Sequence, residues 1–301
     1  INKIFNYNKF IILLEIICLL FFSTLPVLGA ETIQLTDFEG TNSFLGLDRD
    51  INASGQIIYT NAQFIPGGAE TIPNRIDILF DDREGSDPVF LTEEFTNSLY
   101  WNPKINDTGQ AVWFGAPNFD IASSTPTIYH YDGSTTNQYT TGFPTSSTNF
   151  INGSSTVSLA DPLFNNRGEL VWVSNDSNSN ENVILFDVNN KSEVQLTNGS
   201  LGGNSPDLSD SGHVAYVTKN EEVGASSDIF LYHDGVTQQI TNDSFEDVAP
   251  QVNSKGEVAW LTISGPEMGV NYFDGKEIRH IADFASDSFY LFPHPLDINE
   301  S

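Results

Sequence analysis

Cysteine and basic residues are scarce in this sequence of 301 residues. Its one cysteine, Cys18, lies within the first 30 residues, so the remaining chain must be stabilised by a buried apolar core without disulfides. Lys and Arg number 12 against 40 Asp and Glu, which gives a formal net charge of −28. So acidic a chain repels phosphate backbones and anionic lipid surfaces, which argues against nucleic acid as a partner and against membrane binding through a basic patch.

Catalytic signatures are missing too. The sequence contains no Gly-x-Ser-x-Gly, no His-Glu-x-x-His and no phosphate-binding glycine loop. Its five histidines have no metal-ligand spacing, and we interpret His130 and His233, which lie near the ends of comparable apolar segments, as structural. The aspartates are too numerous to indicate an acid and base pair of the kind that glycosidases need, so no catalytic residue is predicted.

A long apolar run occurs at the N-terminus. Residues 10–22 are apolar apart from Glu15, Lys3 and Lys9 precede them, and small residues lead up to Ala30. This pattern is typical of a secretory signal, so we interpret residues 1–30 as a signal peptide. The expected location is secreted, periplasmic or at the cell surface, without stable membrane insertion after cleavage. The alternative is an uncleaved membrane anchor, because the run is nearly long enough to span a bilayer.

A turn followed by an apolar strand recurs five times in residues 31–301. Each copy has a polar triplet, a glycine, and β-prone residues that end in an aromatic side chain. The copies are Asn52–Tyr59, Asn106–Trp113, Asn165–Trp172, Ser209–Tyr216 and Asn253–Trp260, and their glycines lie 54, 59, 44 and 44 residues apart. Glycine supplies the positive φ that tight hairpin turns often need, so each copy predicts a hairpin.

Three further strands are predicted in each repeat. An apolar or aromatic segment that ends in Asp follows the hairpin strand; these segments are Ile76–Asp81, Ile128–Asp132, Ile184–Asp187, Ile229–Asp234 and Val270–Asp274. A last short strand follows at Val89–Thr92, Gln138–Thr140, Val194–Thr197, Gln238–Thr241 and Arg279–Ala282. A strand before the turn is clearest at Ser205–Leu208 and Ala249–Val252. Four short antiparallel strands per repeat, with a shortest period of 44 residues, predict an all-β propeller with four-stranded blades.

The repeat resembles a known family. Ser205–Tyr216, followed by Asp228–Tyr232 and Gln239–Thr241, is similar to the WD40-like repeat of TolB-like β-propellers of secreted bacterial proteins. The resemblance covers residues 31–301 and implies the propeller fold. The turn departs from the family pattern, in which Pro-Asp-Gly follows Ser, and the α/β domain that precedes the propeller in TolB is missing, so TolB's partners are not carried over.

The two ends of the chain predict how the propeller closes. Ile33–Thr36 has the pattern of a blade's last strand, and Pro295–Ser301 matches the start of a repeat and stops one residue before the expected glycine. We therefore expect the N- and C-terminal strands to share one blade, which would remove exposed sheet edges and make six blades, with the last blade truncated here. A longer chain of seven or eight blades is the alternative.

Two sets of residues are candidates for binding. Asp176, Asn178, Asn180 and Asp187 have the alternate spacing of a calcium loop, although Glu181 stands where such a loop needs glycine. Aromatic residues share one repeat position at Tyr59, Trp113, Trp172, Tyr216 and Trp260. They could form a platform for sugars, but we expect them to pack one blade on the next.

The expected function is a non-catalytic extracellular binding or scaffold module. Propellers collect variable connections at one face, so we expect a protein or glycan to bind there, near the long insertions at residues 61–74 and 143–161. The alternative is the propeller portion of an enzyme, either a glycoside-acting one or the gate of a serine peptidase whose hydrolase domain lies beyond residue 301.

Overall fold

The computed structural model describes residues 43–63, 75–82, 87–92, 98–117, 127–140, 162–175, 180–198, 201–219, 226–265, 267–285, 296 and 298–299. The chain divides into Ile1–Thr41, which lies outside these residues, and Asn42–Ser301, to which every element below belongs. The predicted signal peptide and the strand predicted at Ile33–Thr36 are therefore outside the described part. Within that part, no helix is long and apolar enough to cross a bilayer.

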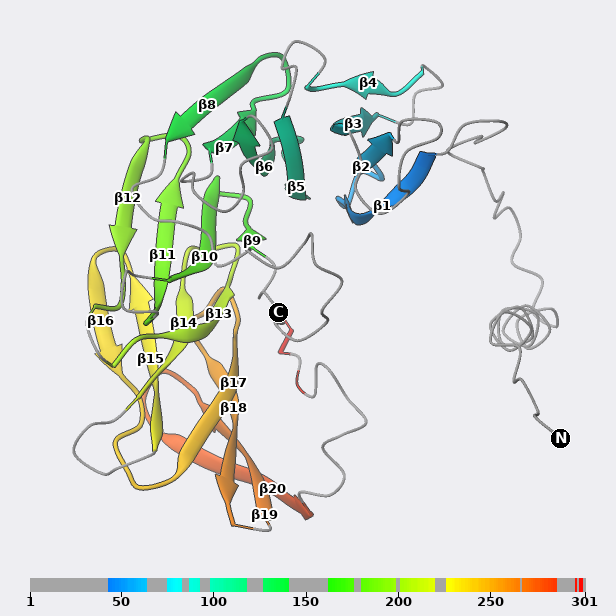
Figure 1. Cartoon of the computed structure of the whole chain (residues 1–301). Helices are drawn as coiled ribbons and strands as arrows, with labels where there is room; N and C mark the ends of the chain where they lie inside the picture. The colour runs from blue at the N-terminus through cyan, green and yellow to red at the C-terminus, as the bar shows by residue number, and fades with distance from the viewer. Residues whose placement is uncertain are drawn as a thin grey trace, which may run out of the picture. The chain divides into compact units, whose positions relative to one another are not determined.

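Twenty strands are described, and they form five groups of four that we call blades 1 to 5 (Figure 1). Blade 1 has β1 (Ser43–Ile51), β2 (Ile57–Gln63), β3 (Arg75–Asp81) and β4 (Val89–Phe90), and blade 2 has β5 (Ser98–Ile105), β6 (Ala111–Pro117), β7 (Thr127–Tyr131) and β8 (Thr136–Thr140). Blade 3 has β9 (Leu163–Phe164), β10 (Glu169–Asn175), β11 (Glu181–Asp187) and β12 (Ser192–Gln195). Blade 4 has β13 (Asn204–Leu208), β14 (Val214–Lys219), β15 (Ser227–His233) and β16 (Val236–Gln239), and blade 5 has β17 (Glu246–Val252), β18 (Val258–Ser264), β19 (Glu267–Phe273) and β20 (Ile278–Ala285).

Strands within each blade pair antiparallel in chain order, which confirms the prediction of all-β, four-stranded antiparallel units. A single parallel bridge between Ser227 of β15 and Glu246 of β17 joins the sheets of blades 4 and 5. Because every other pairing joins strands that follow one another in the chain, hairpins alone are enough to build each blade.

The five predicted glycine turns are confirmed, and they share one hydrogen-bond pattern. In blade 1, Asn52 N–H donates to the Gln56 carbonyl at 3.1 Å and Gly55 N–H donates to the Asn52 carbonyl at 2.9 Å. The other four blades repeat both bonds. Gly55 has φ +79°, and its four counterparts lie between +76° and +89°. Glycine adopts this left-handed backbone without steric cost, which explains why it recurs in every copy.

Side chains of the same turns connect one blade to the next. Asn52 Nδ2 donates to the Asn106 carbonyl at 3.0 Å, and Asn106 Nδ2 donates to the Asn165 carbonyl at 3.0 Å. The last bond of this kind joins Asn253 Nδ2 to the Asn299 carbonyl at 3.3 Å. Asn299 thus takes the place of a first turn residue, which agrees with the predicted start of a repeat at Pro295–Ser301. The predicted count of six blades stays a prediction.

In blades 2, 4 and 5 the first strand carries a β-bulge beside a proline. Asn102, Ser205 and Ala249 each precede a proline and have φ of 51°, 49° and 52°. The register with the second strand shifts at each of these three places. A bulge bends the strand and leaves one residue without its ladder bonds, so the proline that follows costs little there.

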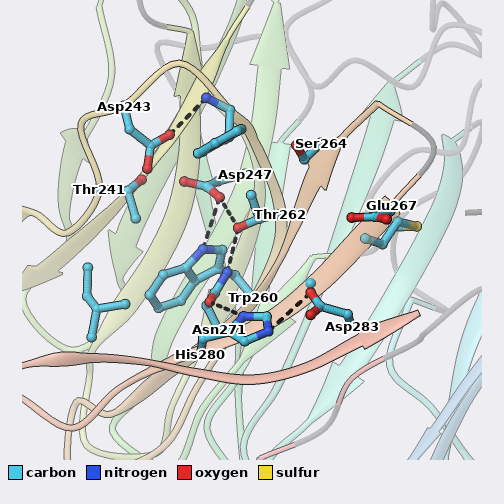
Figure 2. Close-up of a pocket in the computed structure, with 14 residues that line it drawn as sticks. Thr241, Asp243, Asp247, Trp260, Thr262, Ser264, Glu267, Asn271, His280 and Asp283 are labelled. Carbon is cyan, nitrogen blue, oxygen red and sulfur yellow. Dashed lines mark hydrogen bonds and ion pairs between the residues drawn. The ribbon is translucent and has the colours of Figure 1, made fainter. Parts of the chain in front are cut away.

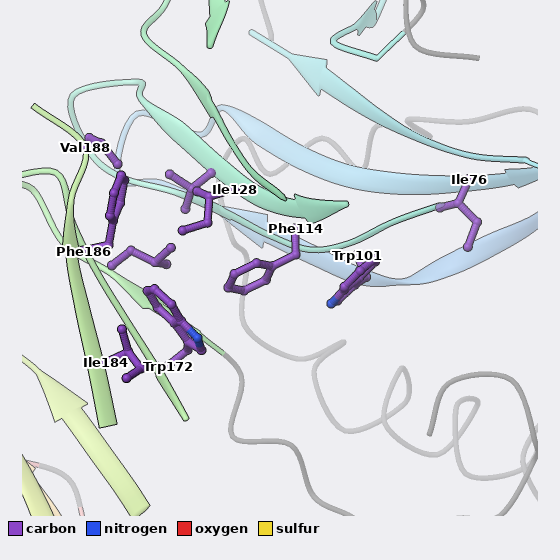
Figure 3. Packing of buried hydrophobic residues seen from close by; sticks show 10 residues of the cluster. Ile76, Trp101, Phe114, Ile128, Trp172, Ile184, Phe186 and Val188 are labelled. Carbon is purple, nitrogen blue, oxygen red and sulfur yellow. The ribbon is translucent and has the colours of Figure 1, made fainter. Parts of the chain in front are cut away.

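Apolar packing joins consecutive blades. Separate clusters lie chiefly between blades 1 and 2, 2 and 3, 3 and 4, and 4 and 5. Between blades 2 and 3, Phe114 meets Trp101 at 6.3 Å and Trp172 at 5.8 Å between ring centroids (Figure 3). The repeated aromatic residues are all buried, with 1% to 7% of their surface exposed: Tyr59, Trp113, Trp172, Tyr216 and Trp260. Trp113, Trp172, Tyr216 and Trp260 each belong to a cluster between two blades, which confirms the expected packing for these four. None of the five rings is exposed enough for a sugar platform.

Candidate functional site

A cavity of about 370 Å³ lies in blade 5, at the opposite end of β17 and β18 from the Asn253–Gly256 turn (Figure 2). Its walls come from the connection after β16 and from all four strands of blade 5. The lining residues are Thr241, Asp243, Phe245, Asp247, Trp260, Thr262, Ser264, Glu267, Met268, Gly269, Asn271, Ile278, His280 and Asp283.

The most buried charged group of this cavity is Asp247, which is 1% exposed. Its Oδ1 accepts hydrogen bonds from Trp260 Nε1 at 3.1 Å and from the Thr262 hydroxyl. Its Oδ2 is buried and has no hydrogen-bond partner. Burial raises the pKa of the Asp247 carboxyl, and the hydroxyls of Thr262 and Thr241 partly oppose that rise, although neither donates to Oδ2. The site therefore holds a carboxylate that lacks a donor on one side.

A line of hydrogen bonds leads from Asp247 to the surface of β20. Asn271 Nδ2 donates to the Thr262 hydroxyl oxygen at 2.7 Å, and Asn271 Oδ1 lies 3.1 Å from His280 Nδ1. His280 Nε2 in turn lies 3.1 Å from Asp283 Oδ1. Asp247, Thr262, Asn271 and His280 are each held by two neighbours, so the polar wall of the cavity is ordered before any ligand arrives.

In blade 2, side chains fill the space that is a cavity in blade 5. The strand pairing places Asp247, Thr262 and Asn271 where blade 2 has Tyr100, Gly115 and Tyr129. In blade 2 the two tyrosine rings meet edge to face at 5.2 Å between centroids. A Cβ on Gly115 would lie only 2.7 Å from either ring, so the tyrosines fill that space completely.

Glycine at the next repeat position enlarges the space in blade 5. Gly269 pairs with Thr262, at the place where the other blades have Asp77, Thr127, Asn182 and Asp228. A Cβ there would lie 3.1 Å from His280 Cε1, so even a methyl group would crowd the histidine. The sequence reasoning did not predict this site. Its signal is the loss of an aromatic or apolar residue at Asn271 and of a side chain at Gly269, which only a comparison of the copies reveals.

Blade 4 has a second cavity at the same repeat position, of about 640 Å³. It is lined by Tyr216, Thr218 and Asp228, the counterparts of Trp260, Thr262 and Gly269. Here the acidic side chain is engaged, because Asp228 Oδ2 accepts from Gln239 Nε2 at 3.2 Å and Oδ1 accepts from the Asp243 N–H at 3.4 Å. The two cavities differ in that blade 5 leaves a carboxylate oxygen free.

The residues predicted to bind calcium are only partly described. Asp176 and Asn178 lie outside the described part of the chain. Asn180 precedes β11 and Asp187 ends it, so the two are separated by an extended strand of about 20 Å and cannot share one ion. Asp187 Oδ1 instead accepts from the Asn189 and Asn190 N–H groups in the next turn. Calcium binding by the remaining three residues stays a prediction.

The histidines do not form a metal site within the described residues, where no group of three or more metal-binding side chains occurs. His130 is buried, burial lowers the pKa of its imidazole, and neither ring nitrogen has a hydrogen-bond partner. His233 stacks on His213 at 3.8 Å between centroids. Both placements are packing arrangements.

The fold and the stacked blades define a β-propeller. No protein-family model matches the chain, and no curated protein does. Among solved structures, dipeptidyl peptidase 4 from Porphyromonas gingivalis is similar at a TM-score of 0.52, with 12% identity over 77% of this chain and 38% of that one. TolB from Acinetobacter baumannii is similar at 0.39, with 16% identity over 69% of this chain and 49% of that one.

The propeller domain of the Trilobed protease from Pyrococcus furiosus is also similar, at a TM-score of 0.42 with 11% identity over 80% of this chain and 85% of that one. These similar structures thus include TolB, a dipeptidyl peptidase and the propeller domain of a protease. The chain spans about half of the Acinetobacter TolB and 38% of the dipeptidyl peptidase. At these identities the likeness establishes the fold alone.

Proposed function

We propose that this protein is an extracellular binding module whose ligand enters the cavity end of the blades. The observation that carries the proposal is the open cavity of blade 5, at a repeat position that blade 2 fills with two tyrosine rings. The other end of the blades is occupied by the glycine turns, which bond from one blade to the next, such as Asn52 to Asn106.

The long insertions predicted to mark the binding face agree with this choice of end. The connection between β2 and β3 leaves blade 1 where Gln63 pairs with Arg75, at the end away from the Asn52–Gly55 turn. This is the same end of the blade as the cavity of blade 5. Residues 64–74 and 143–161 themselves lie outside the described part.

The test is binding of glycan and peptide arrays to the native protein and to two variants. Asn271→Tyr restores the blade 2 residue and should close the cavity, so it should abolish binding. Asn166→Ala changes a half-buried turn residue at the other end and should leave binding intact. Binding that survives Asn271→Tyr and is lost with Asn166→Ala would overturn the proposal. Hydrolysis of a bound glycan or peptide would favour the enzyme alternative.

Export is part of the same proposal. The signal-like pattern of residues 1–30 supports it, with cleavage after the small residues that end at Ala30. N-terminal sequencing of protein recovered outside the cytoplasm should begin near Glu31. Exported protein that retains residues 10–22 would instead establish a membrane anchor.

A further inference from the structure

We propose that the cavity of blade 5 binds an alkyl cation, that is, an ammonium or guanidinium group on a short apolar stem. This inference rests on the proposed function and specifies its ligand chemistry. A lysine or arginine side chain of a partner protein and a free small amine both present such a group.

One carboxylate oxygen of Asp247 has no hydrogen-bond donor. A carboxylate is only an acceptor when ionised, and a buried acceptor without a donor costs free energy. Asp247 Oδ2 is in this situation, while Oδ1 is already used by Trp260 and Thr262. An ammonium or guanidinium group supplies both the missing donor and the opposite charge.

The charged side chains of the cavity lining are acidic. Asp243, Glu267 and Asp283 line the cavity together with Asp247, and none of the described lining residues is Lys or Arg. An anionic ligand would therefore be repelled from the cavity, and a cation is attracted to it. The net charge of −28 for the whole chain acts in the same direction at longer range.

The positions of the carboxylates favour an organic cation over a metal ion as the ligand. Among the described residues, no three acidic or histidine side chains lie close enough to hold a metal. The carboxylates are instead distributed around a cavity of about 370 Å³, within the size range of small-ligand sites. A ligand with several N–H donors spread over a few ångströms fits that distribution, and a single ion does not.

Part of the cavity wall is apolar. Phe245 and Ile278 are 44% and 48% exposed, and both line the cavity beside Met268. Large apolar side chains this exposed gain free energy when a methylene stem covers them. Trp260, by contrast, is 1% exposed and offers no open ring for a sugar to stack on.

Calorimetric titration of the whole protein tests the inference with three probes. Butylamine and butylguanidinium carry the cation on an apolar stem, and butanol is the neutral counterpart. We expect both cations to bind and butanol to bind at least tenfold more weakly. Equal binding of butanol, or no binding of either cation, would overturn the inference.

Variants then locate the binding. Asp247→Asn keeps the size of the side chain and removes its charge, and it should weaken cation binding at least tenfold. Asp283→Asn, at the exposed edge of the cavity, should weaken it by a smaller factor. Asp210→Asn removes one charge at the turn end and should have no effect. Equal losses for Asp247→Asn and Asp210→Asn would show that only net charge matters and would overturn the site.

A peptide arm distinguishes the sources of the cation. A short peptide with one central arginine should bind more tightly than butylguanidinium if a protein partner supplies the group, and more weakly if a free amine does. Glycans that bind the native protein and fail to bind Asn271→Tyr, in the absence of any cation binding, would overturn the cation inference and leave the proposed function standing. The unfolding midpoint of each variant should lie within a few degrees of the native value, which shows that lost binding is not lost folding.

Discussion

Blades 2 and 5 have the same four strands, the same glycine turn and the same buried tryptophan, yet they use one repeat position in opposite ways. Blade 2 places Tyr100 and Tyr129 over Gly115 and fills the space with aromatic rings. Blade 5 places Asp247 and Asn271 at the positions of the tyrosines and leaves a cavity. In blade 5 the Trp260 indole N–H donates to Asp247, whereas the indole nitrogen of Trp113 has no partner.

The difference shows that one repeat position can be filled by aromatic rings or left open as a cavity. Packing at the repeated aromatic position joins consecutive blades at Trp113, Trp172, Tyr216 and Trp260. The hydrogen bonds of the glycine turn recur in each of the five described blades. The position two residues beyond the tryptophan differs between the two blades: Gly115 lies under two tyrosine rings, whereas Thr262 lines the cavity. Under the proposed function, the polar groups there serve a ligand at a cost in local stability.

The largest change in the free energy of unfolding is expected at the buried tryptophan that blades 2 and 5 share. Trp113→Ala should lower the free energy of unfolding by about 3–5 kcal/mol, because it leaves a large cavity between blades 1 and 2. Urea denaturation measures this loss. Phe245→Ala, at an exposed residue, should change stability by no more than about 0.5 kcal/mol. Equal losses for the two variants would mean that the tryptophan does not carry the packing of the blades.

The next largest change in stability is expected at Asp247. Burial raises the pKa of its carboxyl, so the folded protein binds more protons than the unfolded chain in the window from the ordinary Asp value up to the raised one. This group therefore contributes less stability as pH rises through that window. Asp247→Asn should stabilise the ligand-free protein at neutral pH, by about 1–2 kcal/mol, and have less effect near pH 4. Urea denaturation at both pH values measures the difference, and a variant that is less stable than the native protein at neutral pH would contradict it.

A smaller loss of stability is expected when the first residue of a glycine turn is changed, and it should be similar in all blades. Asn106 Oδ1 accepts from two backbone N–H groups of its own turn, and Nδ2 donates to the Asn165 carbonyl of the next blade. Asn106→Ala should therefore cost about 1 kcal/mol, as the loss of a capping side chain does. Ser209 has this position in blade 4, and Ser209→Asn should not destabilise the protein. Thermal unfolding of both variants tests the pair, and a destabilising Ser209→Asn would show that the blades are not interchangeable at this position.

The smallest effect is at Asp132, which ends the third strand of blade 2. Its carboxylate accepts from the Ser134 and Thr135 N–H groups, and these bonds hold the pKa of Asp132 well below its ordinary value. A lowered pKa contributes stability above the ordinary Asp value that is lost as pH falls below it. The sign is opposite to that of Asp247. Because Asp132 is exposed, Asp132→Ala should cost only a few tenths of a kcal/mol at neutral pH, detectable as a shift in the urea midpoint. No shift at neutral pH, or a larger loss in acid than at neutral pH, would contradict this reading.

Much of the fold could be predicted because the repeat depends on local chemistry. Gly55 and its counterparts need only the backbone of their own turn to specify a hairpin, and the segments that end in Asp81 or Asp187 alternate or cluster apolar residues as strands do. The role of the aspartates was not predicted. Asp187 and Asp132 cap the turn after the third strand, which depends on N–H groups two and three residues away. The predicted calcium loop included Asp187 because spacing alone does not show that β11 separates it from Asn180.

The period, the turns and the buried aromatic position could be predicted, since each depends on residues close together in the chain. The place of the cavity in blade 5 could not be predicted, because it depends on contacts across the sheet. Asp247, Asn271 and His280 come from three different strands, and they meet because the pairing of β17 to β20 aligns them across one face of blade 5. The cavity of blade 5 also takes Thr241, Asp243 and Phe245 from the connection after β16, so the hairpins of one blade alone do not form it. A polar residue at any one of these positions is unremarkable in the sequence, and it becomes part of a site only when its neighbours across the sheet leave the space unfilled.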